Sequence, residues 1–234
     1  MMLGMGLSMS AGGGVKSFSP SQLSNLTWWL RGDLGVVGGG TPTAWNDQST
    51  AGNNLTTGAG TLSLLATGAP NSLPAVRFGA ATSSLSGVGR PFNGNAYTLW
   101  IVQRITGGPL GSQNTVVLGS TTKVALGLNS GASRLMTIGA NTQNDSPSTY
   151  TSATWEAWGY IVSSGGTQVF QVNGSGHTLS GNIAAGTPDA GIALQNTAAA
   201  VTSVDVAEVI GMNATAAAGD ITNVNAYLLA RYGL

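Results

Sequence analysis

Cysteine is absent from this chain of 234 residues. Its absence excludes disulfide bonds and thiolate metal sites. It does not identify a compartment, because a domain of this length can bury a sufficient core without cross-links. The length is also typical of a single all-β domain.

Charge is the second feature in short supply. Charged residues make up 7% of the chain, whereas an average globular protein has about 25%. Eight basic residues balance eight acidic ones, so the formal net charge is zero. The sequence therefore lacks the basic field that attracts nucleic acid or anionic lipid, and we expect neither as a partner. A neutral polar surface favours association, which points to a place in an assembly or on a particle surface.

Long hydrophobic runs are also missing. No stretch approaches the roughly 18 consecutive apolar residues of a membrane-spanning helix, so we expect no membrane partner. The N-terminus has no cationic region ahead of its short, glycine-interrupted apolar stretch. The sequence therefore does not predict an export signal.

The first residues are instead rich in methionine and glycine. Residues 1–17 have no period and too little apolar mass to pack alone. We interpret them as an arm whose flexible side chains fit an irregular groove on a neighbouring subunit. The alternative is that the arm folds back on its own domain. The proposed anchor residues are Met1, Met2, Leu3, Met5, Leu7 and Met9.

Residues 18–234 carry the signals of an all-β domain. Short apolar runs rich in β-branched and aromatic residues alternate with clusters of Gly, Pro, Asn and Ser. Their spacing favours a two-sheet sandwich over alternating βαβ units. The pair Asn173-Gly174 predicts a tight turn, and Tyr97–Val102 reads as a central strand. The expected strands are Leu26–Leu30, Ala75–Phe78, Tyr97–Arg104, Thr115–Leu118, Val124–Leu128, Leu135–Ile138, Trp158–Val162, Val169–Val172, Ile192–Leu194 and Val204–Ile210.

One helix is predicted at the C-terminus. Asp220 serves as its N-cap or as a carboxylate of its first turn. Ile221, Val224 and Leu228 lie three and four residues apart, on one helical face. Gly233 occupies the position after the last turn. We expect this helix against the outside or edge of the sandwich.

Several segments together carry a family resemblance. They are SPSQLSNLTWWLRGD at Ser19–Asp33, AWNDQSTAGNNLT at Ala44–Thr56, LPAVRF at Leu73–Phe78, WEAWGYIVSSGGTQVFQVNG at Trp155–Gly174, VDVAEVIGM at Val204–Met212 and NAYLLARYGL at Asn225–Leu234. In combination they resemble the concanavalin A-like lectin and glucanase superfamily, in the laminin-G-like form found in phage virion and bacterial surface proteins. The resemblance covers almost all of the chain after Phe18. It implies a two-sheet antiparallel jelly-roll sandwich over residues 18–234, a fold that often binds glycans but does not fix function.

The acidic residues do not predict an enzyme. Glycoside hydrolases of that superfamily carry a Glu-x-Asp-x-x-Glu strand, which this sequence lacks, and its only glutamates are Glu156 and Glu208. Hydrolysis needs two carboxyl groups roughly 5–9.5 Å apart. Asp205 and Glu208 point to opposite faces of a strand unless a bulge intervenes. The single histidine, His177, lies in a loop-like stretch without an evident nucleophile. We therefore expect no catalytic residue.

Two weaker features leave alternatives open. Asn46, Asp47 and Ser49 offer oxygen ligands that would suit calcium, but we favour the interpretation that Asp47 and Ser49 bind turn backbone, and we expect no cofactor. The six tryptophans suit core packing better than a sugar platform. Adjacent Trp28 and Trp29 should face opposite ways on a strand.

Two function classes follow. The first is a non-catalytic structural or decoration protein of a phage-like particle, as a capsid decoration, head-fibre or tail component. It would be made in a cytoplasm, exposed on the virion surface, and bound to other virion subunits and to itself as a homo-oligomer. The second is a carbohydrate-binding module or adhesin that recognises surface polysaccharide at a bacterial surface or outside the cell. A glycoside hydrolase is the third and weakest reading.

Overall fold

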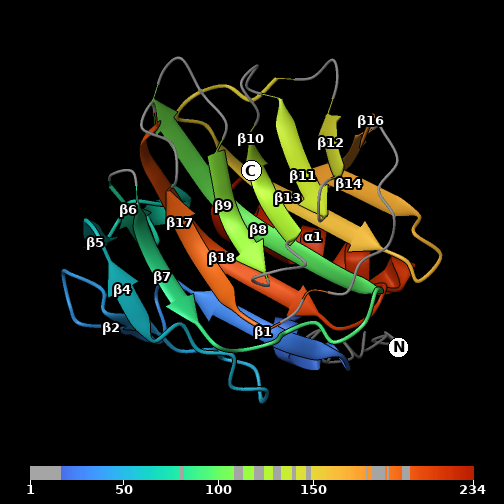
Figure 1. Ribbon diagram of the computed structural model, residues 1–234, viewed down its shortest axis with the longest axis horizontal. Coiled ribbons are helices and arrows are strands. Elements are labelled where there is room, and N and C mark those ends of the chain that lie inside the picture. The colour runs from blue at the N-terminus through green and yellow to red at the C-terminus, as the bar shows by residue number, and fades with distance from the viewer. Residues whose placement is uncertain are drawn as a thin grey trace, which may run out of the picture.

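The strand-forming segments pair into two antiparallel β-sheets that pack face to face (Figure 1). A computed structural model gives their positions and describes residues 17–79, 82–107, 113–118, 124–128, 133–138, 141–145, 149–177, 179–180, 188, 190–196 and 201–234. The predicted all-β antiparallel sandwich with a C-terminal helix is confirmed. The six proposed anchor residues of the arm lie outside the described residues, so their role stays a prediction.

The first sheet is built around two long strands that are buried on both faces. These are β8 (Tyr97–Gly107) and β18 (Val201–Met212), and β13 (Trp155–Val162) pairs with the other side of β8. On the side away from β8, β18 pairs with β6 along one half and with β1 along the other. The remaining strands of this sheet are β1 (Leu26–Arg31), β5 (Leu62–Leu65), β6 (Ala75–Phe78), β14 (Gln168–Val172) and β15 (Ser175–His177).

The second sheet is formed by shorter strands. Its described strands, in spatial order, are β16 (Leu179–Ser180), β12 (Asn141–Asp145), β11 (Arg134–Ile138), β10 (Val124–Leu128), β9 (Gln113–Leu118), β17 (Ile192–Asn196), β7 (Ser83–Gly87) and β4 (Thr57–Ala59). A small ribbon of β2 (Val36–Val37) and β3 (Ala44–Trp45) lies apart from both sheets. Two short 3-10 helices, η1 (Pro20–Gln22) and η2 (Pro70–Ser72), complete the described elements.

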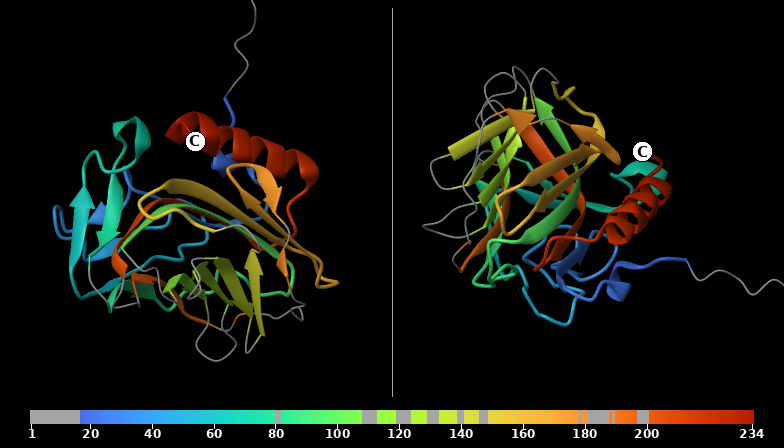
Figure 2. Two further views of the ribbon diagram at one scale, coloured as in Figure 1. Left: turned by 90° about the horizontal axis from the view of Figure 1, so that it is seen from above. Right: turned by 90° about the vertical axis from the view of Figure 1, so that its right-hand side faces the viewer.

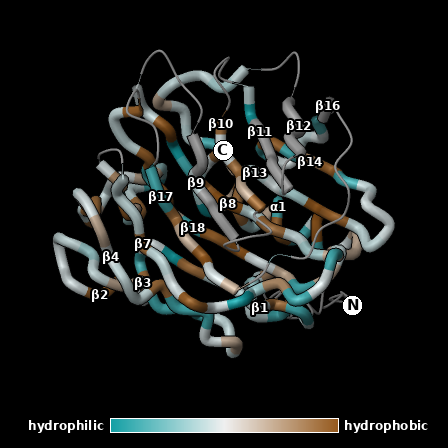
Figure 3. The backbone as a smooth tube through the Cα atoms, viewed as in Figure 1, coloured by the Kyte–Doolittle hydropathy of each residue, from teal (hydrophilic) through white to brown (hydrophobic). Residues whose placement is uncertain are grey.

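The main core lies between the two sheets. Alternate residues of the central strands point into it, because successive side chains of a strand face opposite ways. Figure 3 shows hydrophobic residues concentrated along these strands and hydrophilic residues in the surrounding loops. Leu99 and Ile101 of β8 and Trp158 of β13 are among its buried members.

A second hydrophobic layer covers the outer face of the first sheet. It lies beneath α1 (Ala218–Tyr232), which packs on the side of this sheet opposite the second sheet (Figure 2). Val224 and Leu228 are buried there against Trp100 and Val102 of β8. β8 is therefore apolar on both faces, as the sequence predicts for a central strand. No helix among the described residues is long and apolar enough to cross a membrane.

The helix ends agree with the sequence analysis. Asp220 lies in the first turn, where it is the carboxylate and not the N-cap, since Ala217 takes that position. Gly233 ends the helix in the left-handed region, with φ at 64°, and its N–H donates to the carbonyl of Leu229. Asn173 and Gly174 both have positive φ and join β14 to β15, as predicted for a tight turn.

Candidate functional site

A β-bulge in β18 decides where its two acidic side chains point. The register with β8 shifts between Val206 and Glu208, so Ala207 is an extra residue. Val206 packs in the core between the sheets, whereas Ala207 belongs to the outer layer under α1. Asp205 and Glu208 therefore both face outward, on the side of the helix. Without a bulge, alternation would have placed them on opposite faces.

Glu208 is fully buried beneath the helix, where it accepts three hydrogen bonds and pairs with one guanidinium group. Its Oε1 accepts hydrogen bonds from Trp29 Nε1 at 2.7 Å and the Tyr227 hydroxyl at 3.0 Å. Its Oε2 accepts one from the Tyr232 hydroxyl at 2.9 Å and lies 3.2 Å from Arg231 Nε. Burial raises the pKa of Glu208, although these donors act against the rise. The carboxylate links α1 to β18, and because it is fully buried under the helix it does not face a substrate.

Arg231 extends this network to a second carboxylate. Its Nη2 lies 2.8 Å from Asp33 Oδ2, and the same oxygen lies 2.7 Å from Arg31 Nη2. Burial alone would raise the pKa of Asp33, but the hydrogen bonds from Arg31 and Arg231 outweigh it and lower the pKa. Two arginines are thus balanced by two carboxylates, Asp33 and Glu208.

Asp205 forms a separate cluster. Its side chain is fully buried and accepts four hydrogen bonds from two arginines. Arg77 donates through Nε at 2.7 Å and Nη2 at 2.9 Å. Arg104 donates through Nε at 3.0 Å and Nη2 at 2.6 Å. Arg77 contacts both carboxylate oxygens in a forked geometry, whereas both N–H groups of Arg104 converge on Oδ2. Two charge-assisted hydrogen bonds therefore fix the orientation of each guanidinium group.

The other glutamate lies between the sheets. Glu156 of β13 pairs with Arg134 of β11, with Nη2 of the arginine 2.5 Å from Oε1 of the glutamate. Glu156 Oε2 also accepts a hydrogen bond from Trp158 Nε1 at 2.6 Å. The ion pair therefore connects one sheet to the other inside the core. The two glutamates lie on opposite faces of the first sheet and share no cleft.

The loop proposed as a weak calcium site is held together by hydrogen bonds. Asp47 Oδ1 accepts them from the backbone N–H groups of Trp29 and Ser49, at 2.8 and 2.9 Å. Asp47 Oδ2 accepts them from Ser49 Oγ and the Asn53 N–H, at 2.7 and 2.8 Å. Asn46 precedes Asp47 in the same loop. Asp47 binds turn backbone, and Ser49 Oγ accepts from the Ala51 N–H at 3.2 Å, as we favoured. Among the described residues, no three His, Cys, Asp or Glu side chains form a group that could hold a metal ion.

The tryptophans mostly pack in the two hydrophobic layers. Trp28 lies in the inner core and Trp29 in the outer layer, so they face opposite ways as predicted. Trp155 is the least buried and lies at the margin of the outer layer. The predicted loop position of His177 is wrong, because this residue ends the short strand β15, with its ring edge-to-face against Phe170. Among the six tryptophans, the exposed fraction of the residue is lowest for Trp28, Trp45, Trp100 and Trp158, higher for Trp29 and highest for Trp155.

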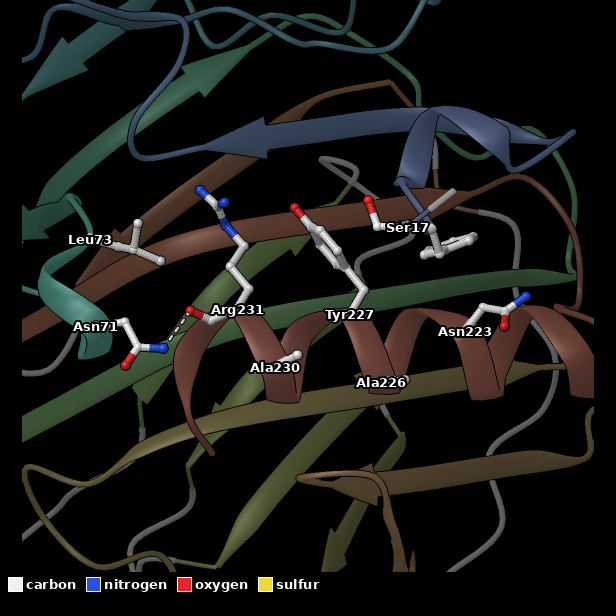
Figure 4. Close-up of a pocket in the computed structure, with 9 residues that line it drawn as sticks. Ser17, Asn71, Leu73, Asn223, Ala226, Tyr227, Ala230 and Arg231 are labelled. Atoms are coloured by element: carbon white, nitrogen blue, oxygen red, sulfur yellow. Dashed lines mark hydrogen bonds between the residues drawn. The ribbon is translucent and has the colours of Figure 1, made fainter. Parts of the chain in front are cut away.

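An open pocket of about 600 Å³ lies beside α1. One stripe of the helix forms its wall, and η2 and the chain leading into the domain form its two ends (Figure 4). The rings of Phe18 and Tyr227 meet edge to face there, with centroids 6.2 Å apart. Asn71 closes the pocket at the end of the helix by donating from Nδ2 to the carbonyl of Arg231 at 2.8 Å. The lining residues are Ser17, Phe18, Asn71, Leu73, Asn223, Ala226, Tyr227, Ala230 and Arg231.

The pocket was not foreseen from the sequence. Polar or amphipathic residues occur at every fourth position along one helical stripe, Asn223, Tyr227 and Arg231. This spacing is a weak indication of a helical face that contacts a ligand as well as the core. Nothing in the sequence indicates that η2 and Phe18 lie against that stripe, because both contacts join distant parts of the chain.

No family model matches the sequence, and no curated protein matches it. Solved structures do share its fold. The binding domain of Paraclostridial Mosquitocidal Protein 1 has a TM-score of 0.68 at 12% identity, over 88% of this chain and 52% of that one. The binding domain of botulinum neurotoxin DC, in complex with SialylT, has a TM-score of 0.64 at 13% identity, over 87% and 51%. Trypanosoma rangeli sialidase, in complex with sialic acid, has a TM-score of 0.60 at 13% identity, over 88% and 33%.

These likenesses concern the fold alone. This chain spans about half the length of the two binding domains and about a third of the sialidase. Identities this low carry no functional residue from one chain to another.

Proposed function

We propose that this protein is a non-catalytic carbohydrate-binding module, with the pocket beside α1 as its binding site. The observation that carries the proposal is the amphipathic lining of that pocket on a lectin-like sandwich. Two of the similar structures are binding domains, one of them in complex with SialylT, and the sialidase is in complex with sialic acid. Their likeness in fold supports a sugar-binding role here as a hypothesis.

The chemistry of the lining suits a sugar. A sugar ring presents an apolar C–H face and a rim of hydroxyl groups, so it needs apolar surface beside hydrogen-bonding groups. The rings of Phe18 and Tyr227 and the methyl groups of Ala226 and Ala230 supply the apolar surface. Asn223 is exposed on the helix and supplies an amide that both donates and accepts. The pocket is also large enough for one or two sugar rings, within the ordinary range for ligand sites.

The absence of catalysis belongs to this proposal. General acid and base chemistry on a glycosidic bond needs two carboxyl groups that face one substrate. The Oε atoms of Glu208 are taken by Trp29, Tyr227, Tyr232 and Arg231, and Glu156 is enclosed between the sheets. We also propose that the sandwich is the laminin-G-like form of the concanavalin A-like jelly roll.

Phe18→Ala and Asn223→Ala test the pocket. We expect each to weaken binding of a glycan selected on an array by about tenfold, or about 1.4 kcal/mol, because each removes a direct contact. Titration calorimetry of the wild type and variants with that glycan measures the change. Thr222→Ala is the matched control, because Thr222 is exposed on the same helix but does not line the pocket. Equal losses in all three variants, or an array on which no glycan binds, would contradict the proposal.

The assignment to a phage-like particle stays a separate prediction, as do the homo-oligomer and the virion surface. None of the described contacts favours it over a free module. The two roles are compatible, since a protein on a particle surface can also bind sugar.

A further inference from the structure

Five residues lie side by side across five strands of the first sheet. Trp155 of β13 is opposite Arg104 of β8, which is opposite Asp205 of β18. Asp205 is opposite Arg77 of β6, which is opposite Ser63 of β5. We call this line, Trp155–Arg104–Asp205–Arg77–Ser63, the cross-strand row. Strands are spaced by about 4.8 Å, so the row extends over roughly 19 Å.

The row carries an uncompensated positive charge. Arginine stays protonated in proteins, and the single carboxylate of Asp205 balances only one of the two guanidinium groups. Arg77 and Arg104 have no other acidic partner among the described residues. In the neighbouring network, by contrast, two arginines, Arg31 and Arg231, share two carboxylates, Asp33 and Glu208, so the charges there are equal in number.

The guanidinium groups are accessible while their counter-charge is not. The side chains of Arg77 and Arg104 are 36% and 23% exposed, whereas Asp205 is 0% exposed. Each guanidinium has five N–H donors and gives two of them to Asp205. The remaining donors have no other hydrogen-bond partner in the described part of the chain, so they are available to a ligand from the solvent side.

The orientation of both arginines is set before any ligand arrives. Two hydrogen bonds to one buried carboxylate hold each group, and Arg104 also stacks over the ring of Trp155, with its Cζ 5.0 Å from the ring centroid. Two oriented guanidinium groups with a net positive charge, each with N–H donors not used by Asp205, form a receptor for a planar anion, above all a carboxylate. Because little side-chain entropy is lost on binding, such a receptor is effective even on a surface.

We propose that Arg77 and Arg104 bind the carboxylate of an acidic sugar, with the ring of Trp155 packing beside that sugar. The choice of a sugar rests on the proposed function, whereas the choice of a carboxylate rests on the arginine pair alone. This site is separate from the pocket beside α1, since the two share no residue. The module would therefore select acidic over neutral polysaccharides.

The test compares one sugar with and without its charge. We expect trigalacturonate to bind the wild-type protein at least tenfold more tightly than its fully methyl-esterified form, and the difference to shrink as salt is raised. Calorimetry and 15N NMR of the arginine Nε–H groups are the measurements. Equal affinity for the acid and its ester would overturn the proposal without any variant having to fold.

Variants then locate the site. Arg77→Gln and Arg104→Gln should each abolish the preference for the acid, and Arg77→Lys should keep only part of it because lysine has the charge without the fork. Arg31→Gln is the matched control, because Arg31 is on the same sheet but is balanced by Asp33. A preference that survives in both Gln variants, or that is also lost in Arg31→Gln, would contradict the assignment.

Two further readouts separate this proposal from the pocket. Phe18→Ala should lower binding of the array-selected glycan but leave the preference for acid over ester intact. Acetate tests the carboxylate receptor without a sugar. If acetate shifts the Nε–H signals of Arg77 and Arg104 but trigalacturonate binds no more tightly than acetate, the sugar part is wrong even if the pocket binds its glycan.

Discussion

At the scale of single residues, the arginines on the outer face of the first sheet differ in how many carboxylates they pair with. Arg231 reaches two carboxylates from distant parts of the sequence, Asp33 and Glu208, and so attaches the last turn of the helix to β18. Asp205, only three residues from Glu208, holds two arginines by itself. The same residue types thus form a structural link in one place and a receptor in the other.

The network around Asp33 makes folding stability depend on pH. Hydrogen bonds from Arg31 and Arg231 outweigh burial, so the folded pKa of Asp33 lies below its ordinary value of 3.8. The unfolded chain therefore takes up the proton first as pH falls. The stabilisation is complete above the unfolded pKa and is lost as pH falls through the folded pKa.

We expect Asp33→Asn to be less stable than the wild type at neutral pH, with a difference that narrows below about pH 4. Urea denaturation of both proteins between pH 7 and pH 2 measures it. Glu208 acts in the opposite direction, because burial raises its pKa and its contribution falls as pH rises. Both proteins keep Glu208, so the comparison reduces its influence. A difference that stays constant to the lowest pH would contradict the role given to Asp33.

At the scale of elements, the strands with long apolar or β-branched runs were predictable and the short polar ones were not. Ala75–Phe78 and Val124–Leu128 were predicted with their observed bounds, and β8 and β18 within a few residues. β4 (Thr57–Ala59) and β7 (Ser83–Gly87) were missed, because serine, threonine and glycine there resemble loop composition. Such strands form only because a neighbouring strand supplies their hydrogen bonds.

The candidate sites were less predictable than the fold. Charged residues inside apolar strands, such as Arg104 and Asp205, were a visible anomaly in the sequence. Their alignment with Arg77 depends on the register of strands that are far apart in the chain. The bulge at Ala207 also has no sequence signature of its own. The sequence therefore indicated only that Asp205 and Glu208 would share a face if a bulge lay between them.

The two ends of α1 offer a matched pair of glycines, Gly219 and Gly233. Gly233 has a φ of 64°, in the left-handed region, whereas Gly219 lies in the first turn with open space around its Cα. We expect Gly233→Ala to lower the free energy of unfolding by about 1–2 kcal/mol, because a Cβ disfavours that conformation. Gly219→Ala should leave stability unchanged or raise it by up to about 1 kcal/mol. Thermal and urea unfolding of the two variants measures both effects, and equal effects would contradict the assignment of the helix end.

At the scale of the whole molecule, the two sheets are joined by more than apolar contact. Arg134 and Glu156 form a buried ion pair between β11 and β13, and the guanidinium lies 6.0 Å from the centroid of the Trp158 ring. Such a pair is expensive to bury and costly to break from one side. It therefore fixes how the sheets face each other more than it adds to net stability.

We expect Glu156→Ala to cost about 3–5 kcal/mol, because Arg134 would keep its charge in the core without this carboxylate. The double variant Arg134→Met, Glu156→Leu should recover most of that loss, since it removes both charges and keeps the volume. A double-mutant cycle in urea measures the coupling. If the double variant is as unstable as Glu156→Ala, the loss comes from packing and not from separating Arg134 from this carboxylate.

The bulge at Ala207 also gives β18 an uneven tolerance to changes in length. Deleting another residue in the middle of this strand would reverse the side-chain alternation in one half of it. Asp205 or Glu208 would then point into the core between the sheets. Losing Ala207 would keep every other side chain on its present side, because Val206 would then directly precede Glu208 in regular alternation. The strand can therefore be shortened at Ala207, where it passes from one neighbour, β6, to the next, β1.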